Sequence, residues 1–365
     1  GALPAETLTS PRMHEAMALC ISCKACKAEC PSSVDMAKLK LEFQAHYHAR
    51  HGVSVRSRFF AQVARLSRLN AGALAPLVNR LSARGPARRI LNRVLGLAPQ
   101  RPLPAFARTP FTAWFSARPA PAPTDKTVVL FNDTFNTYNT PSVAIAATEV
   151  LERAGYTVVL PGHGCCGRPA LSKGLVDEAR AMAQETLSKL APFAERGISI
   201  VGLEPSCILS FDDDYRYLLA DDPRVDLVAS HAVTFEEFIA GLAERGDLEL
   251  DFEPAAPRVL LHGHCHQKAL VGTRSAHETL QAAGCTVEEV DSGCCGMAGS
   301  FGYEAEHYAI SMTMAERRLL PAVRNAGSET LIVAAGTSCR HQIADGTGRH
   351  ALHPAEVLRQ RLTDA

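Results

Sequence analysis

The sequence predicts an α+β protein in which a small helical domain precedes two repeated α/β lobes with parallel sheets. Three observations support this prediction. Closely spaced cysteines lie near the N-terminus, a proline-rich stretch interrupts the chain, and cysteine motifs further on recur about 130 residues apart. We therefore expect four regions, namely a helical domain at 1–60, an arginine-rich helical segment with a proline-rich linker at 61–125, a first lobe at 126–250 and a second lobe at 251–365.

The overall composition is that of a globular protein. With 365 residues, 47% of them hydrophobic and 21% charged, the chain is long enough for two or three domains. Its twelve cysteines fall in tight groups, which indicates metal ligation in a reducing compartment. Because no run of 18 apolar residues and no signal peptide is evident, we expect a cytoplasmic protein, with peripheral contact at the inner membrane face as an option. The chain begins with Gly1 and not Met, so we also expect an upstream segment in the full polypeptide.

Charge is distributed unevenly although the net charge is zero. No acidic residue occurs between Glu42 and Asp125, while arginines recur throughout that stretch. Such a segment can attract nucleic acid, anionic lipid or an acidic protein surface. Because its arginines alternate with apolar residues at helical spacing, we expect amphipathic helices that form a docking surface, and no nucleic-acid partner. The prolines from Arg101 to Asp125 predict an extended linker.

The first cysteine group predicts an iron–sulfur cluster. Cys20, Cys23, Cys26 and Cys30-Pro31 have the spacing with which one loop supplies three thiolates to a [4Fe-4S] cube. Zinc is the alternative, but zinc usually takes two cysteine pairs from separate knuckles. Cys30 either completes this cube or binds a cluster whose other ligands lie upstream. Both assignments of Cys30 are open.

The rest of the chain reads as a duplicated α/β unit. The Cys-Cys-Gly motif at 165–167 lines up with that at 294–296, and Cys207 lines up with Cys339. Strands alternate with helices in each copy, which implies parallel pairing with right-handed crossovers. Open α/β sheets bind ligands at the carboxyl ends of their strands, so the cysteines of each lobe should share a crevice, with one crevice common to both lobes as an option. The expected strands are 127–131, 157–160, 198–203, 258–262, 286–290 and 330–335, and the expected helices are 142–154, 176–193, 274–283 and 304–324.

The cysteines of the two lobes are predicted metal ligands. Vicinal thiols followed by glycine contribute little to core packing, whereas thiols and imidazoles suit soft metals and clusters. The first lobe reads as degenerate, because Thr134 stands where the repeat places Cys265. Cys285 is expected to be an inert buried thiol. The candidate ligands are Cys165, Cys166 and Cys207 in the first lobe, and Cys265, Cys294, Cys295, Cys339 and His264 in the second.

Polar residues beside these thiols allow more than one role. His264 and His266 flank Cys265 and are compatible with ligation and with structural hydrogen bonding alike. Asp133 and His163 could complete a mixed-ligand site in the first lobe, but an Asp directly after a strand is more often a helix cap. No catalytic residue is assigned.

These motifs resemble a known family. The run Cys20–Lys40 (CISCKACKAECPSSVDMAKLK), Gly164–Pro169 (GCCGRP) and Glu204–Cys207 (EPSC) are similar to the C-terminal half of bacterial FAD-linked oxidases of the D-lactate and D-2-hydroxyglutarate dehydrogenase type. That half joins a ferredoxin-like domain to cysteine-rich CCG domains. Related iron–sulfur subunits occur in glycolate oxidase, anaerobic glycerol-3-phosphate dehydrogenase and heterodisulfide reductase.

The resemblance implies an electron-transfer role. A [4Fe-4S] cluster would pass electrons from FAD, bound by a partner dehydrogenase subunit or an upstream half, to a quinone or another acceptor. The glycines of 296–302 do not match a dinucleotide-binding motif. The sequence departs from the fuller CCG pattern at Glu204 and Gly336, which stand where a paired C-x-x-C has its first cysteine. Two alternatives therefore accompany the relay, namely a thiol–disulfide reductase acting at the CCG sites and a non-catalytic scaffold stabilised by a metal.

Overall fold

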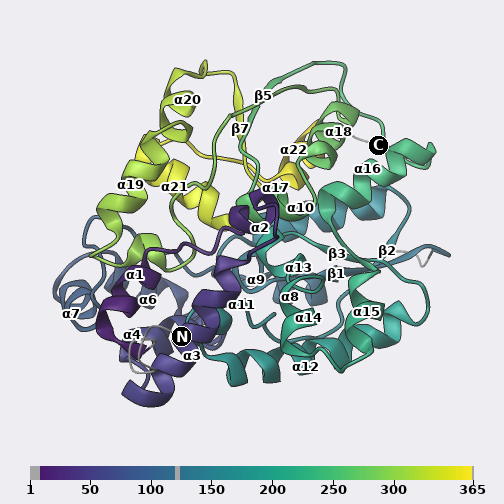
Figure 1. Cartoon of the computed structure of the whole chain (residues 1–365). Helices are drawn as coiled ribbons and strands as arrows, with labels where there is room; N and C mark the ends of the chain where they lie inside the picture. Colours follow the sequence, from purple (N-terminus) through teal and green to yellow (C-terminus); the bar gives the residue numbers. More distant parts are fainter. Residues whose placement is uncertain (1–8, 120–123, 364–365) are drawn as a thin grey trace.

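The N-terminal part of the chain is helical, as predicted. The structure is a computed structural model that describes residues 9–119 and 124–363 (Figure 1). Ser10 caps the first helix ahead of Pro11, and Asp35 caps the third by accepting from backbone N–H groups. The first and third helices pack together, whereas similarity to a ferredoxin stays a prediction. These helices are α1 (Pro11–Ala18), α2 (Ala25–Glu29) and α3 (Met36–His51).

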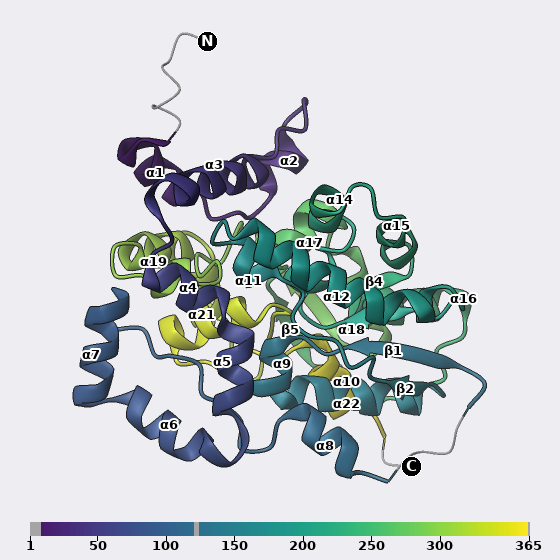
Figure 2. The same ribbon diagram turned by 90° about the horizontal axis from the view of Figure 1, so that it is seen from below.

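The arginine-rich segment forms a series of short helices at the edge of the molecule (Figure 2). The expected extended linker is wrong in part, because a helix begins directly after Pro110 and buries Phe111 in the core. Residues 120–123 of this linker lie outside the described residues. The helices are α4 (Val55–Ala61), α5 (Val63–Asn70), η2 (Gly72–Leu74), α6 (Ala75–Ala83), α7 (Pro86–Leu95) and α8 (Phe111–Ala117).

The first lobe contains a four-stranded parallel sheet with the order β2-β1-β3-β4. Its central strand is apolar on both faces, as expected for a parallel sheet covered by helices. The strands are β1 (Thr127–Phe131), β2 (Thr157–Val159), β3 (Ile200–Gly202) and β4 (Ala232–Thr234). The helices are α9 (Thr134–Tyr138), α10 (Pro141–Arg153), α11 (Arg168–Leu171), α12 (Val176–Ala194), α13 (Pro205–Ile208), α14 (Asp214–Leu218), α15 (Arg224–Ala229) and α16 (Phe235–Arg245).

The second lobe repeats this plan with a three-stranded parallel sheet of order β6-β5-β7. The expected helix at 304–324 is wrong, because it is divided into two helices around Arg317 and Arg318. Pro321 explains the break, since its ring would clash with the carbonyl of residue 317 in a continuous helix. The elements are β5 (Arg258–Leu261), α17 (Cys265–Leu270), α18 (Arg274–Ala282), β6 (Thr286–Glu289), η3 (Phe301–Tyr303), α19 (Tyr308–Glu316), α20 (Leu319–Asn325), β7 (Leu331–Val333), α21 (Thr337–Thr347) and α22 (Pro354–Arg361).

The two lobes share one core, and helices of each lobe pack on helices of the other. Helix α10 of the first lobe packs on α22 of the second, and α16 packs on α18. A single buried cluster accordingly contains Val128 and Leu130 together with Val259 and Leu261. The segments that follow β3 and β5 also approach each other, because α13 contacts α17. Among the described residues, none of the helices has the length and apolarity needed to cross a bilayer.

Candidate metal centre

The first cysteine group forms a loop that lies against the second lobe, where α2 packs on α17. Ser22 (φ 53°) and Lys24 (φ 64°) both adopt left-handed backbone conformations, which is uncommon for residues other than glycine and turns the chain sharply between successive thiols. The sulfur of Cys26 accepts a hydrogen bond from the Met36 N–H at 3.4 Å. Burial raises the pKa of Cys23, and the neighbouring thiols of Cys265 and Cys20 contribute to that shift.

Cys30 lies in a different environment from the other three loop cysteines. The backbone N–H groups of Val34 and Ser32 lower the pKa of its thiol. Among the described residues, no other thiol contributes to that shift. The structure therefore brings Cys23 near a second-lobe thiol, Cys265, whereas Cys30 is influenced mainly by backbone N–H groups of its own segment. Ligation by Cys30 stays a prediction.

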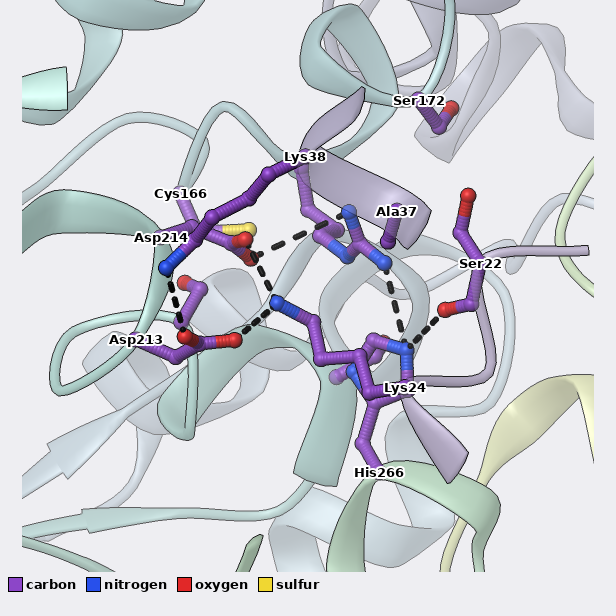
Figure 3. Close-up of polar contacts among 12 residues, drawn as sticks. Ser22, Lys24, Ala37, Lys38, Cys166, Ser172, Asp213, Asp214 and His266 are labelled. Atoms are coloured by element: carbon purple, nitrogen blue, oxygen red, sulfur yellow. Dashed lines mark hydrogen bonds and ion pairs between the residues drawn. The ribbon is translucent and has the colours of Figure 1, made fainter. Parts of the chain in front are cut away.

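A buried ionic cluster holds this loop on the first lobe (Figure 3). The Lys24 ammonium, 1% exposed, forms ion pairs with Asp213 and with Asp214, the latter at 2.6 Å. Lys27 and Lys38 also contact Asp213, at 2.7 and 3.1 Å. Although burial opposes it, the surrounding lysine charges hold the pKa of Asp213 well below its usual range. We call these five residues the lysine clamp.

A second set of contacts ties the loop to both lobes at once. Nε2 of His266 lies 2.9 Å from the carbonyl oxygen of Ser22 and 3.2 Å from the guanidinium of Arg168 (Figure 3). Arg168 begins α11 in the first lobe, and its guanidinium lies 3.8 Å from Asp214. Burial, together with the charge of Arg168, lowers the pKa of His266 well below its usual value, so this imidazole is neutral. These contacts fit the structural one of the two roles expected for His266, and its role stays a prediction.

The second lobe gathers its four predicted thiols into one group. Hydrogen-bonding contacts join Cys265 to Cys294, Cys294 to Cys295, and Cys295 to Cys339. The contact with Cys294, together with burial, raises the pKa of Cys265 well above its usual value, so these thiols are protonated when no metal is bound. Thiolates form when a metal replaces these protons.

A residue that the sequence prediction missed joins this group. His262 directly follows β5, and its ring lies with Cys295 and Cys339 so that one ligand atom from each falls within 4.8 Å of the others. Burial lowers the pKa of His262 to about 3, which keeps the imidazole neutral. One signal in the sequence could have pointed to His262: it occupies a position of the repeat at which the first lobe has the apolar residue Phe131.

His264, the predicted histidine ligand, has other contacts. Its Nδ1 accepts from the His266 N–H at 3.2 Å, and its Nε2 lies 3.7 Å from Oε1 of Glu204. Glu204 belongs to the first lobe, is 3% exposed, and accepts a hydrogen bond from the Thr337 N–H of the second lobe at 2.8 Å. A carboxylate thus crosses between the lobes at the position where the fuller CCG pattern has a cysteine.

The first lobe gathers three thiols in the same arrangement, without a fourth. The Cys166 thiol donates to Cys207 over 3.2 Å, and Cys165 contacts the hydroxyl of Thr134, which takes the place of Cys265. Asp133 caps α9, which is the more ordinary of the two roles expected for it. His163 stacks on Phe131, and Cys285 lies in the core shared by the lobes.

A cavity of about 710 Å³ lies where the lobes, the cysteine loop and the arginine-rich helices meet. Thiols from all three cysteine groups line it, together with aromatic side chains that include Phe59, Phe60 and Phe106. The lining includes Cys20, Cys207, Cys265, Cys294, Cys295 and His264. The structure therefore has a single crevice that is common to both lobes, which was one of the two expected arrangements.

The donor set of the loop fits an iron–sulfur cluster. Three thiols on one sharply turned loop, one of them accepting a backbone N–H, are the groups that such clusters require. The second-lobe set of neutral imidazole and thiols fits a soft or borderline metal.

Several known proteins are similar to this chain. Residues 132–212 and 259–344 match the cysteine-rich domain family named CCG. D-2-hydroxyglutarate dehydrogenase from Pseudomonas putida is 26% identical over 96% of this chain and 35% of its own length. One of the subunits of anaerobic glycerol-3-phosphate dehydrogenase from Escherichia coli K12 is 27% identical over 79% of this chain and 72% of its own length.

A shorter relative matches as well. Lactate utilization protein A from Bacillus subtilis is 28% identical over 60% of this chain and 93% of its own length. Among solved structures, a hypothetical protein from Helicobacter pylori aligns with a TM-score of 0.42 at 12% identity, a likeness too slight to support any argument. The chain spans about a third of the length of the D-2-hydroxyglutarate dehydrogenases. The resemblance predicted from the cysteine motifs is therefore confirmed: two segments of the chain match the CCG cysteine-rich domain, and the chain fits the iron–sulfur half of such dehydrogenases.

Proposed function

We propose that this chain is the iron–sulfur electron-transfer part of an FAD-linked 2-hydroxy acid dehydrogenase of the D-lactate, D-2-hydroxyglutarate or glycolate type. The flavin is carried by a partner domain or subunit, and the final acceptor is a quinone or another electron carrier. Cys20, Cys23, Cys26 and Cys30 are the proposed ligands of a [4Fe-4S] cluster, which when bound supplies one-electron transfer. The chain is thus an oxidoreductase component that is not catalytic alone.

The observation that carries this proposal is the position of the cysteine loop. The lysine clamp and His266 fix the loop between the lobes, and Cys23 there neighbours Cys265 of the second lobe. Sulfur atoms therefore extend from the loop, through Cys265 and Cys294, to Cys295 at the wall of the cavity. A small electron acceptor in that cavity would lie beside this array.

The residues around the loop control its charge and its hydration. Lys40 donates to the carbonyl of Cys20, and Lys24 lies buried between the loop and the first lobe. Positive charge and backbone N–H donors near cluster sulfurs favour the reduced state of such centres. Packing of α2 on α17 keeps one side of the loop away from water.

The arginine-rich helices offer a surface for the flavoprotein partner. Leu77 and Leu81 on α6, and Ile90 and Val94 on α7, are each at least half exposed and lie one helical turn apart within each pair. Apolar side chains so exposed commonly mark protein or membrane contacts. An acidic protein surface is the partner we favour, and an anionic membrane is the alternative. The exposed arginines of the same two helices and their connection are Arg80, Arg84, Arg89 and Arg93.

The first experiment is anaerobic iron and acid-labile sulfide analysis, with EPR of the dithionite-reduced chain. We expect about four irons per chain and a reduced-cluster signal in the parent protein, and the loss of both in Cys23→Ser. Cys285→Ser is the matched control, because that thiol lies in the shared core and should leave iron content unchanged. Zinc without sulfide would favour the scaffold function instead.

Two further variants address the fourth ligand. If Cys30 completes the cube, Cys30→Ser alters the EPR signal and Cys265→Ser does not. The opposite pattern would assign the fourth position to the second lobe, next to Cys23. Thiol–disulfide turnover without a flavoprotein would favour the reductase alternative, for which the 3.2 Å contact between Cys166 and Cys207 is the specific observation.

A further inference from the structure

A carboxylate and an imidazole form a pair at the wall of the cavity, away from the grouped cysteines in the sequence. Nδ1 of His307 lies 2.9 Å from Oε2 of Glu304, and the two residues are 8% and 5% exposed. Both line the cavity of about 710 Å³. Although burial opposes it, the hydrogen bond from His307 and the charge of Lys173 lower the pKa of Glu304 to about 2, so this carboxylate is ionised.

The contacts of His307 hold its ring and leave one nitrogen open. An ionised carboxylate only accepts hydrogen bonds, so the proton between the two side chains belongs to Nδ1 of His307. Phe301 stacks on the imidazole, with ring centroids 4.3 Å apart and planes 8° from parallel. Nε2 makes no hydrogen bond among the described residues and is not sealed from solvent. Because His307 lines the cavity, a molecule bound there can reach this nitrogen.

Ion pairs anchor the Glu304–His307 pair from other parts of the chain. Lys173 of the first lobe pairs with Glu304, and Arg56 of α4 donates two hydrogen bonds to Glu306. Glu304, Glu306 and His307 lie close enough together to hold a metal ion. The two cations already neutralise both carboxylates, however, which disfavours a divalent ion. The charged groups that act on the pair are Lys40, Arg56, Lys173 and Glu306.

The remaining walls of the cavity suit an apolar molecule that contains a ring. Phe59 and Phe60 of α4 line it together with Leu91, Leu103 and Phe106. Its volume lies within the range of about 300–1,000 Å³ that is usual for small-molecule sites, in which a few polar groups orient an otherwise apolar ligand. A protein electron carrier is too large to enter. A quinone combines an apolar ring with carbonyl oxygens that take up protons when the ring accepts electrons.

We propose that His307, positioned by Glu304, donates a proton to a quinone-class acceptor bound in the cavity. This inference rests on the electron-transfer function proposed above and adds the source of the proton. The quinone takes two electrons from the flavoprotein and two protons, so that both C=O groups become C–O–H. Nε2–H of His307 protonates the oxygen that it faces, and solvent then returns a proton to the imidazole. The far oxygen takes its proton from water.

The test is anaerobic stopped-flow reoxidation of the full chain, reduced by dithionite and freed of the excess. The oxidants are menadione, a quinone without a long tail, and ferricyanide, which takes one electron and no proton. We expect His307→Phe, which keeps a ring against Phe301, to slow reoxidation by menadione about 100-fold and reoxidation by ferricyanide less than about twofold. His46→Gln is the matched control, because that side chain is 74% exposed on α3, and it should change neither rate.

The pH dependence separates proton donation from a purely structural role. In the parent, the menadione rate should fall as the pH rises, because the imidazolium loses the proton that it donates. The rate of His307→Phe should not depend on pH, and Glu304→Gln should move the fall to lower pH, since a carboxamide does not stabilise an imidazolium. Equal slowing with both oxidants, or a menadione rate in His307→Phe equal to that of the parent, would overturn the proposal.

Equilibrium dialysis of menadione against the oxidised full chain requires no electron transfer. We expect His307→Phe to bind about fivefold more weakly, through the loss of one hydrogen bond, and His46→Gln to bind as the parent does. A parent chain that has iron, sulfide and the EPR signal but does not bind menadione would refute this inference and leave the electron-transfer function intact. A parent chain without iron and sulfide would overturn that function and this inference together.

Discussion

The substitution Lys24→Met tests whether the lysine clamp holds the cysteine loop on the first lobe. Methionine keeps a chain of similar length and removes the charge. The ammonium and its two carboxylate partners, Asp213 and Asp214, are 1%, 3% and 7% exposed, so the substitution leaves buried carboxylates short of a cation. Removing one partner of a buried ion pair typically costs 3–5 kcal/mol. Asp213 retains Lys27 and Lys38, so we expect the lower end, about 3 kcal/mol.

The assay is native-state hydrogen exchange of the peptide that contains residues 20–30. A cost of about 3 kcal/mol for keeping the loop docked corresponds to roughly 100-fold faster exchange. Lys27→Met is the matched control, because that side chain is 34% exposed and contacts Asp213 alone, so a loss of less than about 1 kcal/mol is expected. If Lys24→Met and Lys27→Met exchange at the same rate, the clamp does not hold the loop.

Neutralising the whole group gives a further check. The triple variant Lys24→Met, Asp213→Asn, Asp214→Asn removes the three most buried charges. Of the cations that lose a partner, Lys27 and Lys38 are 34% and 27% exposed, so water screens them. Replacement of an entire buried ionic group is often close to neutral, so we expect exchange of the loop to return toward the parent rate. A triple variant that exchanges as fast as Lys24→Met would assign the loss to altered packing and not to charge.

Three other predictions concern acid stability, backbone conformation and docking. The folded-state pKa of Asp213 lies below its unfolded value, so the stability that Asp213 gives to the docked loop is complete above about pH 4 and is lost as the pH falls further. Hydrogen exchange of the loop should therefore accelerate below that pH in the parent protein, and less in Asp213→Asn. Gly296→Ala should lower the free energy of unfolding by about 2 kcal/mol or more, because φ is +86° and a Cβ would clash with a carbonyl, whereas Gly293→Ala, which meets nothing within 4 Å, should change urea unfolding by less than about 0.5 kcal/mol. Ile90→Ser with Val94→Ser should leave unfolding unchanged and weaken binding to the flavoprotein; loss of binding to anionic liposomes would instead identify a membrane contact, and full retention of both would exclude this face.

The sequence predicted the lobes well because their strands carry a strong local signal. The strand at 127–131 is present with the expected bounds, and the parallel order follows from the alternation of strands and helices. The helix expected at 304–324 from its periodicity is interrupted, because Pro321 overrides that periodicity. The short helix at 111–117 was missed because prolines on both sides of it predict extended chain, although its aromatic side chains fit the core.

The sequence predicts the cysteines of the candidate site but not the residues that position them. The spacing of the cysteines is itself a recognisable motif. Lys24 and Asp213, in contrast, are 189 residues apart, and neither is a residue type that suggests a cluster ligand. The sequence pattern marks Glu204 only as the position of a missing cysteine, whereas in the structure its carboxylate joins the lobes through Thr337. His262 ends a predicted strand, and in isolation such a histidine is more often structural. Its unpaired nitrogen and the two nearby sulfurs mark His262 as a candidate ligand, and both features are visible only in the structure.

The duplicated lobes have diverged toward different tasks. The first lobe lacks counterparts of Cys265 and His262, yet it supplies Asp213 and Glu204, whose buried carboxylates reach the loop and the second lobe. The second lobe keeps the complete thiol group and the free imidazole nitrogen. Helices of each lobe pack on helices of the other. This shared packing, with the buried carboxylates of the first lobe, explains why thiols from all three cysteine groups meet at a single cavity.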